Sequence, residues 1–282
     1  MEKVMVVGAG TMGSGIAQVV AEAGYPVVLA DIEECLVVRG LARVKSNIEK
    51  KVSKGKLKPE EMHTILDRIQ ITEDVAVGKD CSLVIEAITE DLKAKEELFR
   101  KLDSICDAST IFASNTSTLS ITKMASATKR PDKFIGLHFF NPAPVMALVE
   151  ITKGMLTSDE TLEVAKAFAL SVGKSPVLVN EAPGFIVNRI LLPMINEACY
   201  ELMEGVASAE DIDAAMKLGA NHPIGPLALA DLIGLDVCVY IMEILHSELG
   251  EDKYRPCPLL RKMVRAGKLG RKTGEGFFKY GS

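Results

Sequence analysis

The 282-residue sequence lacks several patterns that mark specialised classes of protein. Its six cysteines are far apart, with no C-x-x-C pair and no cluster of Cys and His, so neither a zinc site nor a disulfide scaffold is expected. We expect these cysteines to be reduced thiols. Internal repeats and low-complexity tracts are also absent, and the length suits about two domains.

The sequence has no excess of positive charge. Lys and Arg number 33 against 38 Asp and Glu, which gives a net charge of −5. This balance excludes a general attraction to nucleic acid or to an anionic membrane. A hydrophobic share of 48%, with 25% charged residues, is typical of a globular chain with a sizeable core.

No hydrophobic run is long enough to indicate a membrane span. Residues 4–21 carry no charge, but they include four glycines and the polar residues Thr11, Ser14 and Gln18. Only one Glu and one Lys precede them, which is a poor basic region for a signal peptide. We therefore expect a cytoplasmic protein without a membrane partner.

Two patterns of hydrophobic residues divide the chain. Short Val- and Ile-rich runs, at 4–7, 27–30, 83–86, 111–113, 134–137 and 148–151, alternate with segments of helical length such as 92–105. Further along, apolar residues recur at helical spacing over 185–203, 208–217 and 227–249. The predicted fold is α/β: a Rossmann-type, mostly parallel sheet at residues 1–182 and an all-helical domain at 183–282.

A glycine-rich turn follows the first predicted strand. Gly8, Gly10 and Gly13 form a G-x-G-x-x-G motif ahead of a helical segment. Gly8 permits the tight turn, Gly10 lets the backbone approach a pyrophosphate, and Gly13 allows the helix to pack closely on the strand. The new helix, starting near Thr11 and Met12, then presents free N–H groups to the phosphates.

Asp31 follows the second predicted strand, 18 residues after Gly13. A carboxylate there bonds a ribose 2′-hydroxyl and repels a 2′-phosphate. The motif therefore favours NAD as cofactor. NADP remains possible, and an N-terminal FAD site is the alternative.

A basic segment at residues 43–58 has a net charge of +6, so the rest of the chain sums to −11. Arg43, Asn47, Lys50 and Lys54 share one helical face. Two interpretations remain open: a solvated helix face, or a site for a polyanion such as the phosphates of coenzyme A. Nucleic acid is less favoured because no aromatic residue interleaves the lysines.

Six segments are distributed along nearly the whole chain: GAGTMGSGIA at 8–17, ASNTSTLSIT at 113–122, GLHFFNPAPVMALVEI at 136–151, APGFIVNRILLPMINEA at 182–198, AMKLGANHPIGPLALADLIGLD at 215–236 and GRKTGEGFFKY at 270–280. Together they resemble the 3-hydroxyacyl-CoA dehydrogenase family. The resemblance implies an NAD-linked oxidoreductase of fatty acid or butyrate metabolism. The length is similar to that of stand-alone bacterial members, which interconvert (S)-3-hydroxybutyryl-CoA and acetoacetyl-CoA.

The resemblance also implies a catalytic dyad. His138, at the end of one predicted strand, would be the general base and acid, and Glu150, taken to end the next strand, would be its partner. The sequence pattern alone also fits a core histidine. The resemblance assigns Ser117 and Asn188 to substrate oxygens, although a turn residue and a surface helix residue are the plainer interpretations.

Further roles rest on the same resemblance. It implies a homodimer formed through the helical domain, Lys54 in contact with coenzyme A, and Asn47 in place of a family serine. It also implies cofactor contacts from a second set of residues, namely Glu90, Lys95, Asn115, Asn141 and Lys272. Two other functions share the nucleotide motif: a dehydrogenase of a free hydroxy acid or sugar acid, and a non-catalytic nucleotide-sensing protein.

Overall fold

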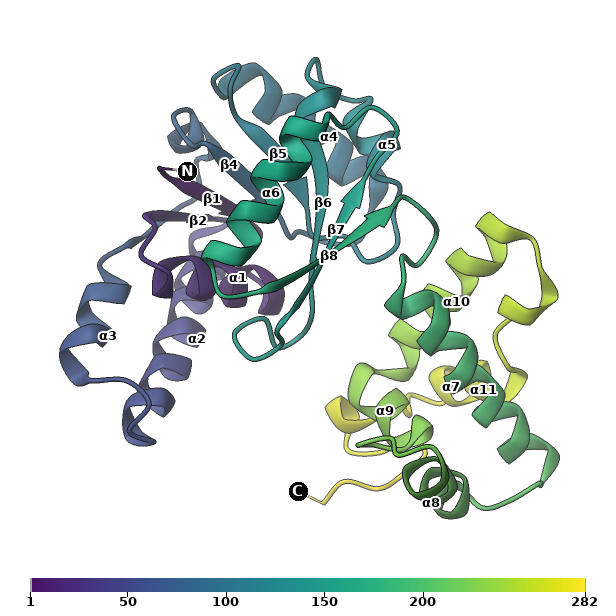
Figure 1. The fold of residues 1–282 in the computed structure, drawn as a ribbon. Helices are drawn as coiled ribbons and strands as arrows, with labels where there is room; N and C mark the ends of the chain where they lie inside the picture. Colours follow the sequence, from purple (N-terminus) through teal and green to yellow (C-terminus); the bar gives the residue numbers. More distant parts are fainter. Residues whose placement is uncertain (1, 282) are drawn as a thin grey trace. The chain divides into compact units, whose positions relative to one another are not determined.

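The computed structural model describes residues 2–281. The chain divides between Ala182 and Pro183 into two compact units. The first is a sheet flanked by helices, and the second is helical (Figure 1). The predicted fold class, a mostly parallel α/β sheet followed by an all-helical part, is confirmed.

The N-terminal unit is built on an eight-stranded sheet in the order β3-β2-β1-β4-β5-β6-β7-β8. Strands β1 to β6 run parallel, β7 is antiparallel to β6, and β8 is parallel to β7. The strands are β1 (Val4–Val7), β2 (Val27–Ala30), β3 (Ile69–Thr72), β4 (Leu83–Glu86), β5 (Ile111–Ser114), β6 (Phe134–Phe139), β7 (Leu148–Lys153) and β8 (Ser175–Asn180). The sequence pattern predicted six of them and missed β3 and β8.

Helices cover both faces of this sheet. They are α1 (Thr11–Glu22), α2 (Glu34–Ser53), α3 (Pro59–Leu66), α4 (Leu92–Ile105), α5 (Ile121–Ala125) and α6 (Asp159–Ser171). Ile16 of α1 and Phe168 of α6 share one core with Leu137 of β6. On the other face, the Phe99 ring of α4 lies 4.5 Å from that of Phe134. Because both faces are covered, the parallel strands form continuous apolar runs.

The C-terminal unit packs five helices around a second core. They are α7 (Val187–Glu204), α8 (Ala209–Gly219), α9 (Pro226–Ile233), α10 (Leu235–Leu249) and α11 (Pro258–Arg265). The single helix expected over 227–249 is wrong: Gly234, at φ +106°, separates α9 from α10. The buried Asp231 of α9 accepts the backbone N–H groups of Phe277 and Phe278, which fastens the C-terminal segment to this core.

All six cysteines are free thiols, and Cys35 alone is exposed. Burial raises the pKa of Cys81 to about 11 and that of Cys238 to about 12. These buried thiols are therefore unreactive at neutral pH. Over residues 2–281, no helix has both the length and the apolar character that a membrane crossing requires.

Candidate active site

The glycine-rich turn has the backbone that a dinucleotide requires. Gly8 has φ +104°, and a Cβ there would lie 2.4 Å from the carbonyl oxygen of Ala87. A Cβ on Gly13 would lie 1.7 Å from the Gly8 carbonyl oxygen, whereas a Cβ on Gly10 would meet nothing within 4 Å. Gly8 and Gly13 are therefore required by the fold, and Gly10 leaves open space for a ligand.

Helix α1 begins directly after Gly10, which provides no side-chain cap, and its first turn contains no acidic residue. Its N-terminal N–H groups and its dipole therefore suit the pyrophosphate of a dinucleotide. The open space over Gly10 and the uncapped helix end together show that this turn fits NAD.

Asp31 follows β2 and lies beside the glycine turn. Its Oδ2 accepts the Ala9 N–H at 2.6 Å, and its Oδ1 accepts the Ile32 N–H at 2.8 Å. Each carboxylate oxygen retains capacity for a further hydrogen bond. Asp31 is therefore held in the place that a ribose-binding carboxylate occupies in this type of fold.

The pairing of β6 with β7 brings His138 and Glu150 face to face. The antiparallel register puts the two residues directly opposite each other. Nδ1 of His138 lies 2.7 Å from Oε2 of Glu150, and the two residues are 7% and 0% exposed. Because a carboxylate only accepts, Nδ1 donates, and the neutral ring then carries its lone pair on Nε2.

One expectation about this pair is wrong. Glu150 does not end its strand but is the third residue of β7. Since β7 runs antiparallel to β6, its beginning lies beside the end of β6, where His138 sits. The direction of β7, rather than two parallel strand ends, brings the carboxylate to the histidine.

Two neighbours fix the position of the dyad. The Phe140 ring packs against the imidazole of His138, with centroids 4.3 Å apart. Oδ1 of Asn115 accepts the backbone N–H of Phe139 at 2.9 Å. Asn115 therefore connects the end of β5 to the end of β6 through its carbonyl oxygen.

A buried carboxylate, Glu86, ends β4 and pairs with Lys95 of α4. Nζ of Lys95 donates to Oε1 of Glu86 at 2.5 Å, and the two residues are 1% and 0% exposed. Glu86 also accepts the Ser114 hydroxyl at 2.6 Å and the Ile88 N–H at 2.7 Å. Burial raises the pKa of Glu86, and the Lys95 ammonium opposes that shift.

Lys95 also reaches Glu90, with Nζ 3.0 Å from Oε2. Oε1 of Glu90 accepts the backbone N–H of Ser117 at 3.1 Å and the hydroxyl of Thr118 at 3.2 Å. The hydroxyl of Thr116 donates to the same oxygen. Glu90 therefore organises the loop that carries Ser117, and Lys95 holds Glu90.

The basic segment separates into two sets of side chains. Arg43, Asn47 and Lys51, four residues apart on α2, bond to the neighbouring α1 segment: to the Ala9 carbonyl, to Gln18 and to Glu22, respectively. Lys50 and Lys54 are exposed, and no hydrogen bond or ion pair of their side chains occurs within residues 2–281. The carboxamide nitrogen of Asn47 already donates to Gln18, at 3.2 Å.

Two predicted residues lie in the C-terminal unit. Asn188 is the second residue of α7 and is buried. Lys272 is exposed, and its Nζ donates to Oδ2 of Asp236 at 2.6 Å. Asn141 is an exposed residue of the N-terminal unit, in the connection between β6 and β7.

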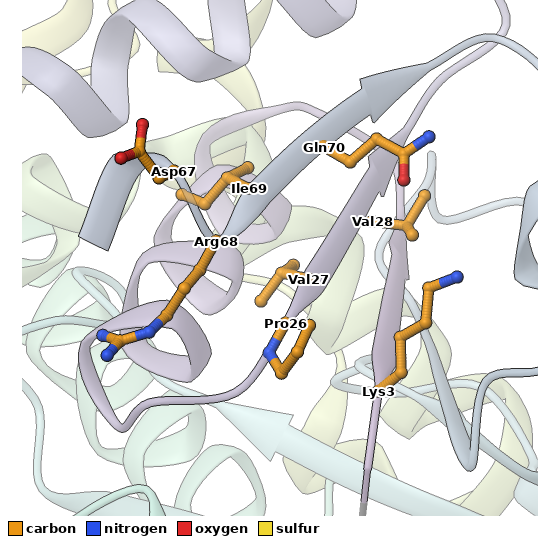
Figure 2. Close-up of a pocket in the computed structure, with 8 residues that line it drawn as sticks. All are labelled: Lys3, Pro26, Val27, Val28, Asp67, Arg68, Ile69 and Gln70. Carbon is orange, nitrogen blue, oxygen red and sulfur yellow. The ribbon is translucent and has the colours of Figure 1, made fainter. Parts of the chain in front are cut away.

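A cavity of about 340 Å³ lies at the opposite end of the sheet, and Figure 2 shows the residues that line it. Three of its lining residues, Lys3, Pro26 and Arg68, precede β1, β2 and β3 in the chain. Open α/β sheets bind ligands beyond the carboxyl ends of their strands. This cavity is therefore separate from the glycine turn and from the dyad.

Sequence reasoning missed Glu86 among the residues of this region. The available signal was an acidic residue closing an otherwise apolar predicted strand, L-V-I-E. A carboxylate at the carboxyl end of a buried parallel strand needs a partner, and that requirement points to the site.

A dinucleotide-type turn and a buried histidine–carboxylate pair, both on one parallel sheet, define the class of the nicotinamide-dependent dehydrogenases. Two family models match the chain: the 3-hydroxyacyl-CoA dehydrogenase NAD binding domain over residues 3–182, and the 3-hydroxyacyl-CoA dehydrogenase C-terminal domain over 184–280. The chain belongs to the 3-hydroxyacyl-CoA dehydrogenase family, and its cofactor is NAD.

Individual relatives agree with this assignment. A 3-hydroxybutyryl-CoA dehydrogenase of Clostridioides difficile is 52% identical over 278 residues, which is 99% of each chain. The human mitochondrial hydroxyacyl-coenzyme A dehydrogenase is 46% identical and covers 99% of this chain and 91% of its own. The solved (S)-3-hydroxybutyryl-CoA dehydrogenase of Ralstonia eutropha matches with a TM-score of 0.97 at 50% identity over the whole of both chains.

Proposed function

We propose that the protein interconverts (S)-3-hydroxybutyryl-CoA and acetoacetyl-CoA. The observation that carries this proposal is the 2.7 Å contact between Nδ1 of His138 and Oε2 of Glu150, buried on the sheet that carries the dinucleotide turn. The names of the bacterial relatives, at about half identity over full length, support the short acyl chain.

The dyad performs the proton transfer. Oxidation of a secondary alcohol requires that its hydroxyl proton be removed, and the reverse reaction requires that the proton be returned. In this proposal Nε2 of His138 accepts that proton. Glu150 holds the ring in one tautomer and stabilises the imidazolium that results. NAD, when bound, supplies the acceptor for the hydride.

The remaining residues bind and orient. The glycine turn, with Thr11 and Met12 at the start of α1, holds the pyrophosphate, and Asp31 holds the ribose. Ser117 and Asn188 orient the substrate oxygens. A second set, Glu90, Lys95, Asn115, Asn141 and Lys272, acts toward the nicotinamide end, and for Lys95 the structure supports an action through Glu90.

A coupled absorbance assay tests the reaction itself. Acetoacetyl-CoA with NADH should be consumed rapidly, and acetoacetate without coenzyme A should not. Turnover of the free acid at the rate of the thioester would instead favour a dehydrogenase of free hydroxy acids and contradict the proposal.

Asp31→Ala should narrow the preference for NADH over NADPH. The wild-type carboxylate repels a 2′-phosphate and bonds the 2′-hydroxyl, and both effects disappear with the side chain. We expect kcat/KM for NADH to fall roughly tenfold, which corresponds to a loss of about 1.4 kcal/mol of binding free energy. The change in kcat/KM for NADPH should be smaller. Steady-state kinetics with the two cofactors measure the ratio. A wild type that prefers NADPH would contradict this role of Asp31.

Lys54→Ala should raise KM for acetoacetyl-CoA and leave kcat unchanged. The proposal assigns the exposed Lys50 and Lys54 to the phosphates of coenzyme A, and loss of such uniform binding affects KM alone. Added salt should raise the wild-type KM in the same way. Lys101→Ala, an exposed lysine on α4, is the matched control. Equal KM values for the coenzyme A thioester and a short pantetheine thioester would exclude this site.

We also propose a homodimer through the C-terminal unit. Apolar side chains exposed on that unit support it: Ile190 is 69% exposed, Val206 66% and Leu218 88%. Two-fold symmetry is the commonest arrangement of such an assembly. Light scattering at micromolar concentration should give twice the chain mass of 30.4 kDa, and a fully active monomer would exclude the dimer.

A further inference from the structure

The connection between β6 and β7, residues 140–147, is irregular backbone that joins the strand of His138 to the strand of Glu150. It contains Asn141, which the proposed function assigns to the cofactor. Ala143 in this loop is 2% exposed. Irregular backbone that is buried needs donors for its carbonyl oxygens from elsewhere in the chain.

Lys174 supplies two of these donors. Its Nζ donates to the carbonyl oxygen of Ala143 at 2.6 Å and to that of Met146 at 2.7 Å. The backbone N–H of Ser175 adds a third bond, to the Ala147 carbonyl at 2.8 Å. One side of the loop is therefore fastened to residues 174 and 175.

The backbone of Lys174 is itself held in place. It follows Gly173, whose φ of +72° ends α6 in the left-handed conformation. The Lys174 N–H donates to the Ala169 carbonyl at 2.9 Å, which completes the C-terminal cap of α6. Lys174 therefore fastens the loop from a rigid base.

The loop also packs on α1. A Cβ built on Gly15 would lie 3.2 Å from Cβ of Ala143 and 3.3 Å from Cδ of Pro144. A side chain at this position would crowd the loop, so glycine suits this close approach. The loop is therefore held between Lys174 and α1, the helix that begins at the dinucleotide turn.

The charge of Lys174 is unusual in this setting. The residue is 8% exposed, and both of its acceptors are main-chain carbonyls rather than carboxylates. Burial lowers the pKa of its amine, the Lys51 ammonium of α2 lowers it further, and the Glu22 carboxylate of α1 opposes the shift. A buried cation is costly unless its hydrogen bonds are satisfied, and the two carbonyls accept two of the three N–H groups of this ammonium.

We propose that Lys174 is a positioning residue for cofactor binding, because it holds the 140–147 loop against α1 and so fixes Asn141 for the nicotinamide end of NAD. This inference rests on the proposed function, which places Asn141 at the cofactor. It assigns to Lys174 an effect on cofactor affinity through the loop, without direct contact with either reactant.

Lys174→Met tests the proposal, since it keeps the length of the side chain and removes the donors. We expect Kd for NADH, from fluorescence titration, to rise about tenfold, the value of about 1.4 kcal/mol. Hydrogen exchange at residues 140–147 should accelerate in the cofactor-free protein. Lys174→Arg retains the donors and the charge, so its Kd for NADH should stay within about threefold of the wild-type value. Lys166→Met, at a more exposed lysine on α6, should change neither quantity.

The pH profile gives a second test. The wild-type Kd for NADH should rise at alkaline pH as the Lys174 ammonium loses its proton. Because the pKa of Lys174 is lowered, this rise should begin at a lower pH than the titration of an ordinary lysine would give. Lys174→Arg should remove that rise because guanidinium stays charged. A folded Lys174→Met protein with the wild-type Kd would overturn the proposal. If Lys174→Met does not fold, the pH dependence of the NADH Kd decides instead. A dependence in Lys174→Arg that is identical to that of the wild type would overturn the proposal. The assay with acetoacetyl-CoA judges the proposed function separately.

Discussion

His138→Gln should lower kcat for acetoacetyl-CoA reduction by about 10²–10⁴ and leave KM nearly unchanged. The imidazole is the group that gives and takes the substrate proton in the proposed mechanism, and glutamine cannot exchange a proton at neutral pH. Stopped-flow or steady-state loss of NADH absorbance measures the effect. His63→Gln, at an exposed histidine of α3, is the matched control and should keep full activity.

Glu150→Gln should also lose activity, because an amide can no longer stabilise the imidazolium. The double variant should be less impaired than the product of the two single effects, since the residues are bonded at 2.7 Å and act as a unit. A His138→Gln protein that binds NADH normally and keeps kcat within a few-fold of wild type would exclude the dyad from catalysis.

The apolar strands were predictable because both faces of a parallel sheet are covered. The bounds of β1, β2 and β4 are those that the Val- and Ile-rich runs predict. The edge strands β3 and β8 were missed because they are only partly buried and so lack an unbroken apolar run. Edge strands need less hydrophobic sequence than central ones, which weakens their signal.

The direction of β7 was also open to prediction. A parallel connection needs a dozen or more residues, and the eight residues at 140–147 are too few. This short connection requires an antiparallel pair, and the pair then places Glu150 opposite His138. The Val and Ile content of a strand does not indicate its direction. The number of residues that connect the two strands does indicate it.

The long-range polar network was not predictable in the same way. Lys174 bonds to carbonyls 28 and 31 residues away, and Lys95 pairs with two carboxylates, Glu86 at the end of β4 and Glu90 in the segment that follows it. Such contacts depend on where the loops return over the sheet. A sequence pattern identifies the charged residue, and only the folded chain shows which partner satisfies it.

Lys95→Met should be among the most destabilising single substitutions in the N-terminal unit. It leaves Glu86, 0% exposed, without its cation, and breaking a buried ion pair in this way costs about 3–5 kcal/mol. The free energy of unfolding from urea titration measures the loss. Lys93→Met, at an exposed lysine of the same helix, should change it by less than about 0.5 kcal/mol.

The Lys95→Met variant should lose less stability, relative to the wild type, at acidic pH. The Lys95 ammonium lowers the pKa of Glu86 in the wild type, so its removal lets burial raise that pKa further above the unfolded value. A group with a raised pKa in the folded state stabilises the fold below its unfolded pKa and loses that contribution as the pH rises. The destabilisation should therefore be smaller at pH 5 than at pH 8. Adding Glu86→Gln should recover part of the loss, because no buried charge remains. Equal destabilisation at both pH values would show that Glu86 does not carry the effect.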